Sequence, residues 1–294
     1  AFYKMDQSMV TDYPIVNYLP RVAENESVKY PMAGMTSHKV EIGIYDVATS
    51  TVTYLQMGDV TDRYFTNLAW VPDNKTLLVA ELNRAQNHML MKRYDAVSGA
   101  LMSQLFDEKS DKWVEPEHPA AFVPFMANMF IWQSSRDGYN HLYLYDIDGR
   151  MIKQITSGQW EVVSILSFNA AEKSVLIETT LPSPIERHIY KVSLVNGKST
   201  RLTNDEGVHQ AVTDANGEYL FDNYTSLNNP GVAQIIDTKG KVKRIIARAD
   251  NPLKDYLMPK IELVQLKADD GSTLYGRLIL PTSFDASKKY PVVM

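Results

Sequence analysis

A phrase that is repeated every 45 to 51 residues constrains this chain more than any other feature of its sequence. The anchors of the repeat are a tyrosine or isoleucine at positions 45, 94, 145, 190 and 236. An aspartate follows most of these anchors, and a turn that contains glycine or serine comes shortly afterwards. A period of this length, with several strands in each unit, is typical of the blades of a β-propeller.

The content of each unit favours strands over helices. Short apolar runs such as 76–80, 129–132 and 141–145, which we interpret as alternating, are separated by turn pairs such as Asp148-Gly149 and Asn196-Gly197. Such pairs supply the positive φ that two-residue hairpins require, and no long segment has apolar residues at helical spacing. The sequence therefore predicts an all-β fold with four full blades, at about 66–108, 120–158, 161–204 and 208–248, and a partial blade at 1–58.

The C-terminal segment departs from the repeat. Residues 261–266 alternate, Asp269-Asp270-Gly271 predicts a turn, and residues 274–280 form the return strand. A second apolar run begins at Tyr290, where we expect a new strand. We therefore predict propeller blades over residues 1–257 and the beginning of another domain over 258–294, and we expect the chain to be part of a longer one because both ends read as strands.

Composition excludes several classes of protein. Apolar residues make up 45% of the chain and charged residues 22%, which is enough for a buried core. The net charge of −5 argues against a nucleic-acid partner, and the absence of cysteine excludes disulfides, thiolate metal sites and thiol nucleophiles. The longest apolar stretch, residues 120–132, is broken by Pro124 and Asn128 and is too short to cross a bilayer.

Candidate polar clusters are few. No two of the six histidines stand at a metal-ligand spacing, so we predict neither a metal site nor a cofactor. Glu115, Glu117 and His118 are close in sequence, but we interpret them as an acidic loop rather than as metal ligands or a glycosidase carboxylate pair. His141 follows a Gly-Tyr-Asn turn, and we expect it to be a hydrogen-bonded strand residue rather than a general base.

Five phrases, in order along the chain, carry a resemblance to a known family. They are Tyr30-Pro-Met-Ala-Gly34, Leu82-Asn-Arg-Ala-Gln-Asn87, Gly138-Tyr-Asn-His-Leu-Tyr143, Gly158-Gln-Trp-Glu-Val162 and the stretch from Leu278 to Val293. In these the chain resembles the dipeptidyl peptidase IV branch of the prolyl oligopeptidase family of serine peptidases. The resemblance implies an eight-bladed propeller, of which our repeats account for four blades and a part. It also implies that 258–294 is the beginning of an α/β-hydrolase domain, and that the whole enzyme removes Xaa-Pro or Xaa-Ala dipeptides from peptide N-termini.

The same resemblance implies where the chemistry lies. The family's nucleophile, its aspartate and histidine, and its oxyanion-hole tyrosine would follow Met294, and the glutamates that bind the substrate amine would precede Ala1. No Gly-x-Ser-x-Gly elbow occurs in the chain. We therefore expect no catalytic residue here and no activity of the chain alone. The loop that contains Val114 and Glu115 would line the far side of the substrate pocket, although aromatic and basic residues would be expected there. Because Val114 and Glu115 depart from that pattern, the residues themselves favour a solvated loop between blades.

The remaining expectations concern partners and location. The resemblance implies a peptide substrate, a propeller that gates and orients it, and a periplasmic or cell-surface location. Exposed blade edges lead us to expect homo-oligomers. The alternative function is a non-catalytic binding propeller of the periplasm or cell surface, which would have no reason to continue into the segment 278–294. A carbohydrate-active propeller would instead need carboxylates clustered at one mouth.

Overall fold

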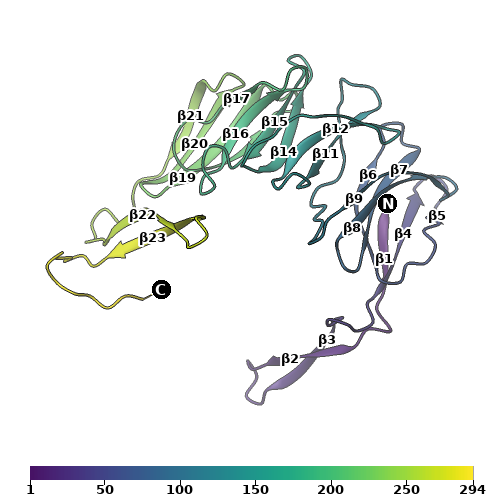
Figure 1. Ribbon diagram of the computed structural model, residues 1–294, viewed down its shortest axis with the longest axis horizontal. Coiled ribbons are helices and arrows are strands. Elements are labelled where there is room, and N and C mark those ends of the chain that lie inside the picture. Colours follow the sequence, from purple (N-terminus) through teal and green to yellow (C-terminus); the bar gives the residue numbers. More distant parts are fainter. Residues whose placement is uncertain (294) are drawn as a thin grey trace. The chain divides into compact units, whose positions relative to one another are not determined.

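A computed structural model describes residues 1–293, and these residues form strands, turns and connecting loops without a helix (Figure 1). Four sheets have four antiparallel strands each, and their strands pair in chain order. This confirms the prediction of blade-like sheets over the middle of the chain. The first two of these sheets consist of β6 (Arg63–Trp70), β7 (Thr76–Asn83), β8 (His88–Asp95) and β9 (Leu101–Lys109), and of β10 (Ala121–Phe122), β11 (Met129–Ser134), β12 (His141–Asp146) and β13 (Met151–Gln154).

The other two four-stranded sheets follow directly in the sequence. They consist of β14 (Val162–Asn169), β15 (Ser174–Thr179), β16 (His188–Ser193) and β17 (Ser199–Arg201), and of β18 (Val208–Thr213), β19 (Tyr219–Ser226), β20 (Asn229–Asp237) and β21 (Val242–Arg248). The chain divides into two compact units. One comprises 1–179 and 190–200, and the other comprises 180–189 and 201–293.

The partial blade at the N-terminus contains an insertion that the sequence analysis missed. β1 (Phe2–Asp6), β4 (Lys39–Asp46) and β5 (Thr51–Tyr54) form a three-stranded sheet. Between β1 and β4 the chain makes a separate hairpin of β2 (Asp12–Asn17) and β3 (Glu24–Lys29), whose side chains are almost all exposed. The hairpin has no repeat signature, so nothing in the sequence separates it from the partial blade.

The core of the first unit explains why its central strands are so apolar. In β7, Leu77 and Val79 pack in one cluster with side chains of β4, whereas Leu78 and Ala80 pack in another cluster with side chains of β11. Both faces of β7 are therefore buried, and seven of its eight residues are buried. A strand that is buried on both faces needs a continuous apolar run. Our interpretation of 76–80 as an alternating run was therefore wrong, and so was that of 129–132 and 141–145, which are also buried without alternation.

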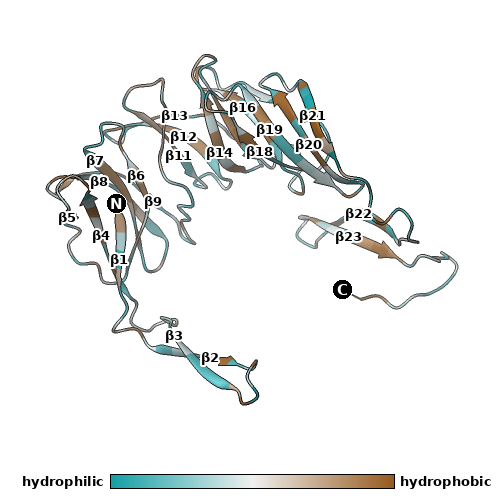
Figure 2. Cartoon of the chain, turned by 180° about the vertical axis from the view of Figure 1, so that it is seen from behind, coloured by the Kyte–Doolittle hydropathy of each residue, from teal (hydrophilic) through white to brown (hydrophobic). Residues whose placement is uncertain are grey.

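Strand β19, in the second unit, does alternate. Its buried residues, Leu220, Asp222 and Tyr224, alternate along the strand with exposed residues such as Tyr219 and Phe221. Successive side chains of a strand point to opposite faces, so one face of this sheet is covered and the other is accessible. Figure 2 shows that the strands of this sheet carry both hydrophobic and hydrophilic residues.

The repeated aspartate has a local structural role. It ends the third strand of its sheet, and its carboxylate accepts backbone N–H groups of the turn that follows. The side chain of Asp95 accepts from Val97 (3.1 Å) and Ser98 (2.7 Å), and that of Asp237 accepts from Lys239 and Lys241 (both 2.9 Å). The carboxylates of Asp46 and Asp146 also accept backbone N–H groups of the turns that follow them. In the sheet of β14–β17, where lysine follows the repeated tyrosine, the hydroxyl of Ser193 at the end of β16 accepts such N–H groups instead.

The repeated glycine serves the packing between sheets. Gly99 and Gly149 have φ of 71° and 89°, which favours glycine. A Cβ on Gly99 would lie within 3.0 Å of the carbonyl oxygen of Tyr54 in β5, and one on Gly149 would lie within 3.0 Å of that of Leu105 in β9. The turn after the third strand of one sheet therefore rests on the last strand of the sheet before it, which explains why the glycine recurs with the blade period.

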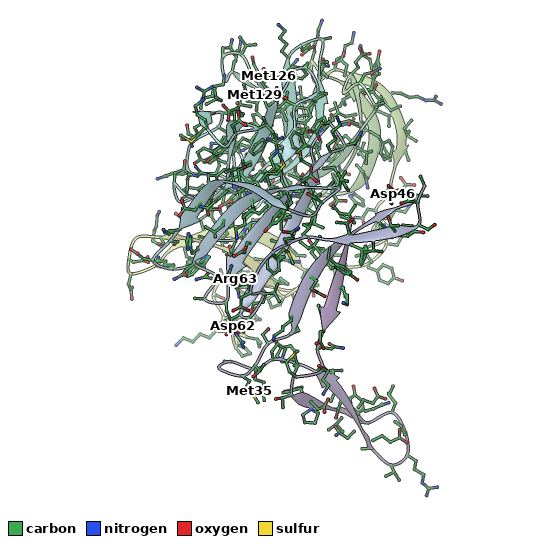
Figure 3. The ribbon with its side chains drawn as sticks, turned by 90° about the vertical axis from the view of Figure 1, so that its right-hand side faces the viewer. Met35, Asp46, Asp62, Arg63, Met126 and Met129 are labelled. Atoms are coloured by element: carbon green, nitrogen blue, oxygen red, sulfur yellow. The ribbon has the colours of Figure 1, made fainter. Side chains whose placement is uncertain are left out.

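The two ends of the sheets in the first unit differ. One end carries the turn between the first and second strands of each sheet, and the other carries the turn between the second and third strands. Figure 3 shows these ends for β6–β13, with Met126 and Met129 at the first and Asp62 and Arg63 at the second. We call them the Met126 end and the Asp62 end.

The C-terminal hairpin is separate from the four-stranded sheets. β22 (Lys260–Lys267) and β23 (Thr273–Leu280) pair in register around the predicted turn at Asp269–Gly271, which confirms that hairpin. Residues 290–293 form no strand, so the strand expected from Tyr290 is not found there, and Met294 lies outside the described residues. Instead the Tyr290 hydroxyl accepts the backbone N–H of Asp285.

Candidate functional site

The loop that contains the two candidate residues is anchored at the Asp62 end of the first unit. It connects β9 to β10. Within it, the N–H of Ser110 donates to the carbonyl of Asn87 (3.0 Å), and the N–H of Val114 donates to that of Gln86 (2.7 Å). The Asn67 side-chain amide donates to the carbonyl of Pro116 (2.6 Å). These three bonds fix the path of the loop, so it is not the freely mobile segment that an acidic stretch suggests.

The partner of this loop is the β7–β8 turn. Its conformation is set by Asn83, whose side-chain oxygen accepts the N–H groups of Asn87 (3.0 Å) and His88 (3.1 Å). Gln86 takes a φ of 54° and presents the carbonyl that receives Val114. The asparagines of the phrase 82–87 therefore shape the turn on which the candidate loop rests.

The loop forms one wall of a cavity of about 560 Å³. Val114 and Glu115 both line it, together with Trp113 and Arg136. The Val114 side chain is half-buried and packs against the core between the sheets, whereas Trp113 is 60% exposed. Glu115 is also exposed, and within residues 1–293 its carboxylate has no hydrogen bond or ion pair. The structure thus places the two predicted residues on the wall of one cavity.

The opposite wall is built around Arg136 in the β11–β12 turn. Its guanidinium lies 4.2 Å from the centre of the Tyr143 ring and donates to the hydroxyls of Tyr145 (2.7 Å) and Ser134 (3.0 Å). It also forms an ion pair with Glu108. The Glu108 carboxylate, in turn, accepts from the Trp132 indole (2.8 Å) and the Ser134 hydroxyl (2.9 Å).

Electrostatics keep this wall in a fixed charge state. Burial acts to lower the pKa of Arg136, but the Glu108 charge and the hydrogen bond to Tyr145 outweigh it, so that the pKa is raised. Burial raises the pKa of the Tyr145 and Tyr143 phenols as well. The positive charge of Arg136 is therefore compensated within the protein, whereas Glu115 and Lys112, which line the same cavity, form no ion pair with the other described residues.

Sequence reasoning missed Arg136 and Glu108. They come from a turn of one sheet and the last strand of the sheet before it, 28 positions apart. No local spacing indicates such a pair. The only feature of the sequence that points to these residues is that each apolar run is followed by polar residues: Ser134 follows Trp132, and Glu108 follows Phe106.

His141 is fully buried, as we expected for a structural histidine. Its Nε2 donates to the carbonyl of Gly158 (3.0 Å), so Nδ1 accepts from the Thr156 hydroxyl (3.1 Å). That hydroxyl oxygen also accepts the N–H of Leu142 (2.9 Å). Both ring nitrogens are used, which confirms the hydrogen-bonded strand residue and leaves neither nitrogen for general-base chemistry.

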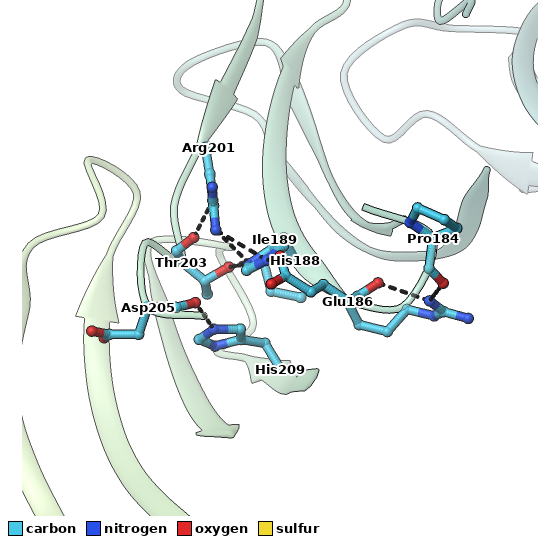
Figure 4. A network of polar contacts seen from close by, with 9 residues as sticks. Pro184, Glu186, His188, Ile189, Arg201, Thr203, Asp205 and His209 are labelled. Carbon is cyan, nitrogen blue, oxygen red and sulfur yellow. Dashed lines mark hydrogen bonds and ion pairs between the residues drawn. The ribbon is translucent and has the colours of Figure 1, made fainter. Parts of the chain in front are cut away.

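The second unit contains the corresponding arrangement one period later, around His188 (Figure 4). The Thr203 hydroxyl lies 3.1 Å from Nδ1 and accepts the N–H of Ile189, and the Glu186 carboxylate lies 2.8 Å from Nε2. Burial is the main cause that lowers the pKa of His188. A hydroxyl, an imidazole and a carboxylate thus follow one another as in a hydrolase triad, but the imidazole is fully buried and the hydroxyl binds the backbone, so the arrangement is structural.

The described part of the chain contains neither a cluster of metal-ligating side chains nor a membrane-spanning helix. Over residues 1–293, no three side chains of the histidine or carboxylate type converge as metal ligands. The same residues include no helix that is long and apolar enough to cross a membrane.

Comparison with known proteins agrees with this architecture. Residues 1–231 match the family model for the dipeptidyl peptidase IV (DPP IV) N-terminal region. The chain is 25% identical over 313 residues to dipeptidyl peptidase 4 of Trichophyton rubrum and covers 40% of that protein. It is 26% identical over 315 residues to a probable dipeptidyl peptidase 4 of Aspergillus clavatus, again covering 40%. The chain thus spans about two fifths of the length of these relatives.

Solved structures give the same result. A putative dipeptidyl aminopeptidase IV from Bacteroides ovatus superposes with a TM-score of 0.91 at 41% identity, over 99% of this chain and 44% of the other. Dipeptidyl peptidase 4 of Porphyromonas gingivalis superposes with a TM-score of 0.86 at 26% identity, over 98% of this chain and 41% of the other. With its blade-like sheets and the match over 1–231, the chain belongs to the family of dipeptidyl peptidase IV N-terminal regions.

Proposed function

We propose that the chain is the propeller part of a serine-type dipeptidyl peptidase that releases Xaa-Pro or Xaa-Ala dipeptides from peptide N-termini. The observation that carries the proposal is the family match over residues 1–231, with relatives named dipeptidyl peptidase 4. In this proposal the catalytic serine, aspartate and histidine lie outside the chain, residues 258–294 begin the hydrolase domain, and the propeller gates and orients the peptide.

The test compares the chain with a longer protein that contains it. The longer protein should hydrolyse Gly-Pro-p-nitroanilide and should be labelled by a fluorophosphonate, which reacts with activated serines. The 294-residue chain should do neither. Hydrolysis by the chain alone would refute the assignment of the catalytic residues. A longer protein that is neither labelled nor active would favour a binding propeller without catalysis.

We further propose that Val114 and Glu115 face the bound peptide. The loop is held by three hydrogen bonds, and the Glu115 carboxylate is free on the cavity wall. A carboxylate without an ion pair, carried on a backbone that is held in place, favours a peptide with a positive charge near it. In the longer protein, Glu115→Gln should raise KM for a substrate with a basic side chain by about threefold to tenfold, and should leave kcat unchanged.

Glu117→Gln is the matched control for this experiment. Glu117 lies on the same loop and is exposed, but it does not line the cavity. An equal change of KM in both variants would mean that only the net charge of the loop matters. An unchanged KM in Glu115→Gln would place the peptide elsewhere.

We also propose a periplasmic or cell-surface location, on the basis of the family, and homo-oligomers formed through exposed sheet edges. Cell fractionation with an antibody against the chain tests the location, because the protein should appear in the periplasmic or surface fraction. Its appearance in the cytosolic fraction would contradict the proposal.

A further inference from the structure

A second cavity lies at the Met126 end of the first unit, opposite the candidate site. It has a volume of about 350 Å³, within the range of small-molecule sites. Its walls come from the β6–β7 turn, the segment between β10 and β11 and the residue after β12. The lining side chains are mainly apolar; they include the buried Val71 and the partly buried Phe122, Met126, Met129 and Ile147.

One cation, Arg93 on β8, lines this cavity. Its side chain is only 18% exposed, and its Nε atom is buried without a hydrogen-bond partner among the described residues. The carboxylate that pairs with it, Asp148, is 3.8 Å from Nη1 and is itself 86% exposed. Arg136 at the other end, by contrast, donates to Ser134 and Tyr145 and pairs with Glu108. A guanidinium carries five N–H donors, and a buried donor without an acceptor is unfavourable.

The other charged group that lines the cavity, Asp73, already accepts hydrogen bonds within the protein. Asp73 accepts the N–H groups of Lys75 (2.8 Å) and Thr76 (3.2 Å), and its carboxylate also lies within 3.5 Å of the Thr76 hydroxyl. Its oxygens therefore serve the β6–β7 turn. Of the two charged lining groups, Arg93 is therefore the one that keeps a donor without an acceptor among the described residues.

We propose that this cavity binds a small monocarboxylate with an apolar body. The carboxylate would accept a pair of hydrogen bonds from Arg93, which is the geometry that a guanidinium and a carboxylate favour. The apolar body would pack against Phe122, Met126 and Met129, whose flexible thioether chains adapt to varied shapes. A single arginine in an apolar lining suits one carboxylate better than a phosphate, which carries more charge. The site is separate from the proposed peptide-facing cavity and is independent of that function.

Two sources can supply this chemistry, the C-terminus of a peptide and a fatty acid. Isothermal titration calorimetry of the 294-residue chain with N-acetyl-phenylalanine and with octanoate distinguishes them. We expect at least one of them to bind, and the tighter probe identifies the source. N-acetyl-phenylalaninamide and octanamide, which lack the charge, should bind about tenfold more weakly or worse. The proposal is refuted if neither acid binds at about 10 mM, or if the amides bind equally well.

Variants test the assigned residues. Arg93→Met keeps the length of the side chain and should weaken binding of the acid about tenfold or more. Arg21→Met, in the exposed loop between β2 and β3, makes the same change of charge and should leave binding unchanged. Ala127 is exposed and lines the cavity, so Ala127→Trp should obstruct it without altering Arg93. If both Arg93→Met and Ala127→Trp bind the acid as the unchanged chain does, the site is refuted. Far-UV circular dichroism verifies that each variant is folded.

Discussion

Gly99→Ala should destabilise the first unit far more than Gly58→Ala, although both glycines have φ of 71°. At Gly58 no atom lies within 4 Å of the place that a Cβ would take, so an alanine there meets only the backbone penalty. At Gly99, a Cβ would also meet the carbonyl of Tyr54 at under 3.0 Å and the Cα of Leu55 at 3.3 Å. Because these are backbone atoms of β5 and the residue after it, no side-chain rotation can relieve the contact.

The magnitude follows from these separate effects. The left-handed conformation destabilises the folded state of the alanine variant by about 1–2 kcal/mol. Alanine also reduces the conformational entropy of the unfolded chain, which stabilises the folded state by about 0.4–1 kcal/mol. Gly58→Ala should therefore lower the free energy of unfolding by about 0.5–1 kcal/mol. In Gly99→Ala the turn must also move away from β5, which adds about 1–3 kcal/mol of overpacking. The movement weakens the 2.7 Å bond from the N–H of Gln56 to the carbonyl of Gly99. Losing that bond costs about 1 kcal/mol more.

Urea unfolding followed by tryptophan fluorescence measures the difference, because Trp70 belongs to the sheet whose turn carries Gly99 and Trp132 belongs to the sheet that follows it. We expect Gly99→Ala to lose about 3–4 kcal/mol and Gly58→Ala less than about 1 kcal/mol. If the two variants are equally stable, the recurring glycine serves only the turn conformation, and our account of why it keeps the blade period is wrong.

Three further predictions concern the same sheets. Thr156→Val removes the hydroxyl that binds His141 and the N–H of Leu142, and should cost about 2–3 kcal/mol in urea unfolding, whereas Thr200→Val at an exposed position should cost little. The pKa of Asp237 is lowered to about 2, mainly by Lys243 and by backbone N–H groups. Its stabilising contribution should therefore be complete above about pH 4 and should disappear as the pH falls towards 2, and thermal unfolding of Asp237→Asn should show a weaker dependence on pH in this range. Finally, light scattering should reveal self-association of the chain as its concentration rises, since edge strands such as β21 are exposed, and a strict monomer at high concentration would contradict this.

The sheets could be predicted from the sequence because their recurring residues solve the same local problem in each blade. The aspartate caps the turn after the third strand, and the glycine allows that turn to approach the neighbouring sheet. Both requirements return with every blade, so they leave a period in the sequence. The hairpin of β2 and β3 belongs to no blade and contacts little, and nothing periodic marks it.

The candidate site could be predicted only in part. Val114 and Glu115 were found through a family resemblance, and the structure places them on a cavity wall, but their contact with a substrate remains a proposal. Arg136 and Glu108 were missed because their pairing depends on how one sheet packs on the next. Arg93 was missed for a different reason: what distinguishes it is one buried donor without a partner, which no sequence pattern reveals.

The contrast between these two arginines bears on how a propeller can acquire binding sites. At the Asp62 end, Arg136 is held by hydroxyls and a carboxylate, so it orders the wall and contributes little net charge. At the Met126 end, Arg93 lies among mainly apolar side chains, with its Nε donor unsatisfied and Asp148 as its ion-pair partner. Arg136 and Arg93 both lie beside the packed interface between the β6–β9 sheet and the β10–β13 sheet. This interface holds the backbone at both positions, irrespective of the residues in the turns. Because the interface determines the framework and the turns determine the chemistry, the two ends of one pair of blades can take ligands of different character without a change in the fold.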